Sequence, residues 1–378
     1  MIRVDVKPEL WDWAVERSGA RGAELLKSFP SLRDWRAGSA RPTLKQVEAF
    51  AKAAFVPIGY LLLASPPLEP LPIPDLRTVG GRGPRRPSPD LLETIYLCQR
   101  RQAWYQDHAQ GVGEDPRDFV GSARLTSPPD RVAEKMRSRL GFNLQIQQGC
   151  SSWSDALRKF IMAAEEIGVL VMVSGVVGGN NRRVLDPEEF RGFALSDRFA
   201  PLVFINGADA RAAQMFTAAH EIAHLWLGHS ALSSVDPSPS EAVESWCNRV
   251  AAEFLVPLTK LRQALPESDP LDCVQGLARR FRVSSLVILR RLLEAGVMTR
   301  ERFQTAYDAE IAQSLERRRA GGGNFYKTQS ARLSPRFARA IITSALEGQT
   351  LYRDAYHLLG VKNHQTFEKL ARSLRILA

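Results

Sequence analysis

Cysteine and long apolar runs are both scarce in this sequence. Only four of its 378 residues are cysteine, and they lie far apart with no pairing pattern. Such spacing in a long chain predicts reduced thiols and therefore a cytoplasmic protein. The longest apolar stretches, Val56–Ala64 and Val169–Val177, are far shorter than the roughly 20 residues that a membrane-spanning helix requires. The N-terminus has no continuous apolar core, so we expect neither a signal peptide nor a membrane partner.

The composition excludes a wholly disordered or fibrous chain. Hydrophobic residues make up 44% and charged residues 24%, which is ordinary for a globular protein. The net charge of +10 is unevenly distributed: residues 1–64 and 316–378 are basic, whereas residues 150–260 carry thirteen acidic residues against nine basic ones. The basic ends favour contacts with a polyanion such as DNA, although solvated helix faces account for them equally well.

Proline and glycine divide the chain into four predicted parts. Residues 1–64 show the pattern of short helices, and residues 65–90 hold eight prolines and three glycines, which predicts a linker. Residues 91–320 form the main predicted domain, with its core at 155–260. The Gly321–Gly323 run then introduces a basic C-terminal helical module, 321–378.

The apolar patterns predict an α+β fold that is mostly helical, with helical modules at both ends. Three short strands are expected at Val169–Val173, Phe190–Leu195 and Leu202–Ile205, which would form a small three-stranded sheet. Helices are expected from about Asp209 to Leu227 and from about Glu241 to Leu255.

The N-terminal region resembles part of a repressor-type (XRE-like) helix-turn-helix domain. The similarity lies in Leu32–Gly38 and Arg41–Ala51, which match the second half of such a domain. The first half departs from the pattern, because Ala23–Pro30 stands where these domains have a glutamine-rich helix and a glycine turn. The segment is therefore a degenerate helix-turn-helix, and DNA binding and a purely structural role both remain open.

The most informative residues are His220-Glu-Ile-Ala-His224. On a helix, residues i and i+4 lie on one face, so both imidazoles can bind the same Zn²⁺. Glu221 is rotated by about 100° from His220, where it can act as a general base without being a ligand. Three of the six histidines in the chain fall between residues 218 and 229. The pattern predicts a zinc site suited to metal-assisted hydrolysis.

A third metal ligand is needed, and His229 does not fit. It follows His224 by five residues, whereas the metzincin pattern requires six, and Gly228 is one position later than the pattern requires.

A glutamate from a second helix, as in gluzincins, is the better alternative. Glu244 follows His224 by 20 residues, and Asn248 lies one turn further on the same helical face, where it can orient a ligating histidine. Glu241 remains the alternative glutamate, and Cys247 is interpreted as a core thiol.

The motif and its surroundings resemble the ImmA/IrrE family of metallopeptidases. The resemblance rests on Phe216–Gly228 and Glu244–Pro257, with Val203–Asn206 and Arg211 before them. It implies a zincin-like core with zinc bound by His220, His224 and Glu244, Glu221 as general base, and DNA-binding repressors as substrates. It also implies a helix-turn-helix-like pair at 270–295, on the match of Gln275–Leu292.

Two functions follow from these observations. The first is a zinc endopeptidase that cleaves or regulates a repressor or antitoxin, in a stress, phage or toxin–antitoxin context. The alternative is a non-cleaving DNA-binding regulator or antitoxin with a structural zinc, similar to partners of PIN-type ribonuclease toxins. Glu221 favours the enzyme, because a structural site has no use for an acidic group beside an open coordination position. Arg211, Tyr307 and His229 are candidates for stabilising the transition state.

Overall fold

The fold is known from a computed structural model that describes residues 2–19, 22–74, 87–233, 242–267, 269–320 and 333–377, with no side chains described for 314–320. Most of the predicted linker, Glu241 and the Gly321–Gly323 run lie outside the described residues. These residues form two compact units, one up to Pro72 with the start of a long helix up to Ile95, and one that comprises the remainder.

Among its described residues, the N-terminal unit contains five short helices, as expected from its sequence. They are α1 (Pro8–Arg17), α2 (Gly22–Ser28), α3 (Leu32–Arg36), α4 (Leu44–Ala54) and the 3-10 helix η2 (Ile58–Leu62). Their core is aromatic: the Trp11 ring lies 5.2 Å from Trp35 and 4.9 Å from Phe50. Helix α4 begins with a capping box, in which Thr43 and Gln46 each bind the backbone of the other. Whether this unit is a helix-turn-helix domain stays a prediction.

The second unit contains the remaining helices and all the strands that the structure describes. Its helices are α5 (Pro89–Gly111, from Tyr96 onward), α6 (Pro129–Leu140), α7 (Leu144–Gln148), α8 (Trp153–Glu166), α9 (Arg211–Leu227), α10 (Ala242–Leu255), α11 (Leu258–Ala264), α12 (Val274–Phe281), α13 (Ser285–Glu294), α14 (Arg300–Ala320), α15 (Pro335–Leu346), α16 (Tyr352–Leu359) and α17 (His364–Ser373). The strands are β1 (Leu170–Ser174), β2 (Val176–Val177), β3 (Asn180–Val184), β4 (Gly192–Leu195), β5 (Leu202–Asn206) and β6 (Ala231–Ser233). The α+β, mostly helical fold class is confirmed.

The main sheet has four strands, so the expectation of three is wrong. Its order is β1-β5-β4-β6, with β1 parallel to β5 and the other neighbours antiparallel. The three predicted strands are present as β1, β4 and β5. The fourth, β6, has only three residues and is too short to show an alternating pattern, so its pairing with β4 depends on the tertiary fold. Strands β2 and β3 form a separate hairpin.

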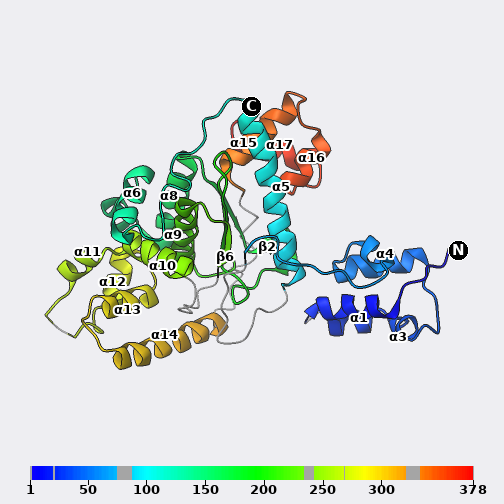
Figure 1. Cartoon of the computed structure of the whole chain (residues 1–378), viewed down its shortest axis with the longest axis horizontal. Coiled ribbons are helices and arrows are strands. Elements are labelled where there is room, and N and C mark those ends of the chain that lie inside the picture. The colour runs from blue at the N-terminus through cyan, green and yellow to red at the C-terminus, as the bar shows by residue number, and fades with distance from the viewer. Residues whose placement is uncertain are drawn as a thin grey trace. The chain divides into compact units, whose positions relative to one another are not determined.

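Helices cover both faces of this sheet, which explains why β4 and β5 are buried along their whole length. Helices α8 and α9 lie on one side, and α5 lies on the other (Figure 1). On the α5 side, the Gln102 side chain donates to the backbone oxygens of Leu195 and Ala200, at 2.9 and 2.8 Å. Among the described residues, no helix combines the length and the apolar character needed to cross a bilayer.

Candidate metal centre

Helix α9 carries both histidines of the motif, and most of its residues are buried. Nearly every residue of Gln214–Leu227 is buried, which is typical of a helix packed on all sides. The helix ends at Gly228, whose φ of 74° lies in the left-handed region that glycine adopts without strain. A Cβ at Gly228 would also approach the Cα of Gly121 to 3.0 Å. The backbone that carries His220 and His224 is therefore held at a fixed position.

Helix α10 carries Glu244 in its first turn and packs directly on α9. Close to Glu244, the Trp246 indole donates to the backbone oxygen of Ser127 at 2.9 Å. This bond ties the start of α10 to the segment that precedes α6.

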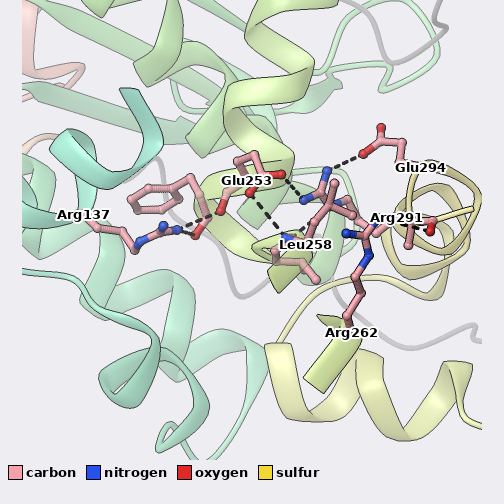
Figure 2. Close-up of polar contacts among 9 residues, drawn as sticks. Arg137, Glu253, Leu258, Arg262, Arg291 and Glu294 are labelled. Carbon is pink, nitrogen blue, oxygen red and sulfur yellow. Dashed lines mark hydrogen bonds and ion pairs between the residues drawn. The ribbon is translucent and has the colours of Figure 1, made fainter. Parts of the chain in front are cut away.

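The far end of α10 is held by two arginines (Figure 2). Arg137 of α6 donates to the backbone oxygens of Glu253 and Phe254, at 2.8 and 2.9 Å. Arg291 of α13 is buried; it forms an ion pair with Glu253 at 2.5 Å and donates to the Val256 carbonyl at 2.9 Å. Bonds of this kind to the free carbonyls of a helix end complete its hydrogen bonding. With both ends tied, α10 presents Glu244 to α9 in one register.

The side chains of His220, His224 and Glu244 converge on a single point. The two Nε2 atoms are 3.1 Å apart, and the Glu244 carboxylate oxygens lie 3.1 Å from His220 Nε2 and 2.9 Å from His224 Nε2. In a tetrahedral zinc site with bonds of 2.0–2.1 Å, neighbouring ligand atoms are about 3.3 Å apart. The described residues contain no other such group of histidine, cysteine and acidic side chains. Two nitrogens and one carboxylate at this spacing are suited to bind a metal ion.

The electrostatics of the cluster favour an ionised Glu244. Burial acts to raise the pKa of its carboxyl, but the charge of His220 and hydrogen bonds from both imidazoles outweigh burial and lower the pKa. Burial also acts to lower the pKa of His220, yet the Glu244 carboxylate raises that pKa overall. For His224, burial dominates and the pKa is lowered. The two imidazoles therefore stabilise Glu244 in its ionised form, the form in which a carboxylate can bind a cation.

Glu221 is fully buried, and it lies against the sheet at the start of β4. A Cβ built on Gly192 would be 2.9 Å from Glu221 Oε1 and 2.6 Å from Thr217 Cγ2. Only a residue without a side chain leaves room there for the carboxylate. The role of Gly192 could not be read from the sequence, because nothing local links a strand glycine to a glutamate 29 residues later.

The remaining predicted residues fall into two groups. Asn248 is within hydrogen-bonding reach of His220, as its helical spacing suggests, and contributes to raising the pKa of that imidazole. Cys247 is fully buried in the hydrophobic core and lies outside the cluster; burial raises the pKa of its thiol, as expected for a core thiol. His229 is exposed beyond the end of α9 and does not belong to the cluster either.

A cavity of about 760 Å³ lies against two neighbours of His220, Phe216 and Asn248. It is lined by Phe216 and Asn248, and also by Tyr307 of α14. Tyr307 accepts a hydrogen bond from Arg290 at 2.8 Å. Arg211, by contrast, lies at the start of α9 and donates to Gln214 at 3.0 Å. The three candidates for stabilising a transition state were Arg211, Tyr307 and His229. Of these, Tyr307 is the one that lines this cavity together with Asn248.

A histidine pair one turn apart on a central helix, a glutamate from the next helix and a small mixed sheet define a zincin-like, metallopeptidase-type domain. Residues 164–293 match the family model of the IrrE N-terminal-like domain (Peptidase M78), which supports the resemblance of this segment to the ImmA/IrrE family. Residues 333–373 match a domain of unknown function (DUF8813). No curated protein matches the chain.

Proposed function

We propose that this protein is a zinc-dependent endopeptidase of gluzincin type. The observation that carries the proposal is the convergence of two imidazole nitrogens and a carboxylate within 4.8 Å of one another, beside a buried glutamate on the same helix. Zn²⁺ is the metal proposed, because it prefers a small set of nitrogen and oxygen ligands in tetrahedral geometry. His220, His224 and Glu244 would hold the ion.

The chemistry requires a Lewis acid and a base. A bound Zn²⁺ would acidify a water molecule and polarise the scissile carbonyl. Glu221 is the base in this proposal: it accepts the proton from the attacking water and delivers it to the leaving amine. Gly192 leaves the space that the Glu221 carboxylate occupies, and Asn248 orients the His220 ring.

The substrate proposed is a DNA-binding repressor or antitoxin. The support is the family-model match of residues 164–293 together with the net positive charge of the N- and C-terminal segments. Such ends suit contacts with DNA or with an acidic partner. The alternative is a regulator whose zinc is purely structural. In that case, replacement of Glu221 would leave the function of the protein unchanged, whereas an endopeptidase would lose its activity.

The decisive experiment is Glu221→Gln, tested by co-expression with a DNA-binding repressor or antitoxin that the wild-type protein cleaves. The substitution keeps size and helix propensity but removes the proton acceptor, so we expect cleavage to fall by about 10²–10⁴-fold while zinc content stays unchanged. Glu166→Gln is the matched control, because Glu166 is an exposed glutamate at the end of α8. Equal cleavage by wild type and Glu221→Gln, with intact zinc, would refute the peptidase and leave the regulator.

A further inference from the structure

The last two helices of the chain are joined as in a helix-turn-helix unit. Helix α16 ends at Gly360, with φ 71°, and α17 begins after Asn363, whose side chain accepts a hydrogen bond from the Thr366 backbone at 2.9 Å. The turn therefore spans residues 360–363 and starts with a left-handed glycine. Helix-turn-helix units join their two helices through a turn of three to four residues that often contains glycine.

Helix α17 packs on α16 through one face only. The Phe367 ring is fully buried, with its centroid 5.5 Å from those of both Tyr352 and Tyr356. Ala371, one turn later, is also fully buried. In addition, Arg101 of α5 donates to the Leu358 carbonyl at 2.8 Å, which fixes α16 to the rest of the unit.

The opposite face of α17 is polar and basic. Gln365, Lys369 and Arg372 are all exposed and lie at i, i+4 and i+7, so they form one stripe along the helix. The only acidic residue of α17, Glu368, borders this stripe one turn before Arg372, and it interacts with His364 at 3.3 Å. A cavity of about 750 Å³ lies between α17 and α8, and Thr366 and Lys369 line it on the α17 side. The edge of α17 that carries these two residues is therefore not packed against the core.

More basic residues flank the stripe at both ends. Lys362 precedes α17 in the turn, and Arg375 follows its C-terminus; both are exposed. Residues 333–377 as a whole hold seven Lys or Arg against three acidic residues. The occupant of this face should therefore be a polyanion.

The β2–β3 hairpin extends the same surface. A Cβ at Gly179 would be 3.8 Å from the Gly360 oxygen, so the tip of the hairpin touches the turn between α16 and α17. The hairpin exposes Asn180, Asn181 and Arg182 beside that turn.

From these contacts we infer that α15–α17 form a DNA-binding module in which α17 enters the major groove of double-stranded DNA. Gln365 and Arg372 are the residues that read bases, because glutamine pairs with adenine and arginine with guanine in that groove. Lys362, Arg375 and Arg182 contact phosphates on either side. The inference does not depend on the peptidase site, and it gives a ligand class to a segment whose family has no assigned function.

The test is duplex binding by the full-length protein, measured as fluorescence anisotropy with random-sequence double-stranded DNA and then with duplexes selected for tight binding. Arg375→Ala should weaken binding to all sequences and reduce the salt slope by about 1. Arg372→Ala should weaken binding to the selected duplex by about 5–150-fold, with a smaller effect on random DNA. Each variant keeps the N-terminal unit intact, so any contribution of that unit stays constant.

Arg131→Ala is the matched control, because Arg131 is an exposed arginine on α6, away from this surface. Thermal denaturation of each variant verifies folding, which substitution of an exposed side chain should not alter. Wild-type protein that does not bind duplex DNA at low salt would overturn the inference, as would wild-type affinity in both Arg372→Ala and Arg375→Ala. Preferential binding of the stripe to single-stranded RNA or to an acidic protein would also overturn it.

Discussion

Gly192 is the residue whose substitution best tests the packing around Glu221. In Gly192→Ala the new methyl group would lie 2.6 Å from Thr217 Cγ2, 2.8 Å from the Phe204 backbone oxygen and 2.9 Å from Glu221 Oε1. All three distances are shorter than a normal carbon contact of about 3.5–4.0 Å. Because the Phe204 oxygen belongs to the central strand β5, the side chains of α9 must move instead.

The cost follows from these distances. Adding one methyl group to a fully packed interior typically costs about 1–3 kcal/mol. For a unit of this size, that corresponds to a decrease in melting temperature of about 2–12 °C. Displacement of the Glu221 carboxylate by the methyl group should lower cleavage by about 10²-fold, since misplacement of a reacting group by 1 Å can have that effect. Zinc content should stay close to one per chain, because the three atoms nearest to the added methyl group belong to Thr217, Phe204 and Glu221 and not to the proposed metal ligands.

The assay compares calorimetric melting, zinc content and cleavage rate for Gly192→Ala with those for Gly276→Ala. Gly276 lies inside α12 with open space around its Cα, so alanine there should stabilise the protein by about 0.5–1 kcal/mol and leave cleavage unchanged. Wild-type melting and wild-type cleavage in Gly192→Ala would refute the packing argument. Loss of zinc together with activity would show that the glycine supports the ligands rather than the base.

Three further predictions concern the ligands and one buried acid. Glu244→Gln should weaken zinc binding measured by metal titration, whereas Glu241→Gln should leave it nearly unchanged; the reverse result would identify the other glutamate as the ligand. Asn248→Ala should weaken zinc binding by about 10–100-fold, as loss of a group that orients a ligand does, and an unchanged affinity would exclude that role. Burial raises the pKa of Glu165, which accepts hydrogen bonds from the Val171 backbone and from the C-terminal segment. The native state therefore binds a proton at Glu165 more tightly than the unfolded chain does. The free energy of unfolding of the wild type, relative to that of Glu165→Gln, should therefore increase as the pH falls from neutral toward 4.5. A difference between the two proteins that does not change with pH would contradict this.

Local features of the chain were readable from the sequence because they depend on backbone geometry alone. The i, i+4 spacing of His220 and His224 places both imidazoles on one face of any helix, whatever surrounds it. Strands β1, β4 and β5 were predicted correctly because they are continuous apolar runs between turn signals. The family motif around His220 and His224 was recognisable because it is a continuous local pattern. The match of residues 164–293 to the IrrE N-terminal-like domain confirms the resemblance.

Relations between distant residues were decided only by the tertiary structure. Glu244 reaches the histidines because α10 packs on α9 with its ends tied by Trp246 and Arg291, and no local pattern specifies that register. The three-residue segment β6 is a strand only because it pairs with the edge of β4. The contact of Gly192 with Glu221 likewise depends on how a sheet meets a helix. Local spacing follows from fixed helical and strand geometry, whereas these juxtapositions follow from which faces of the elements bury each other.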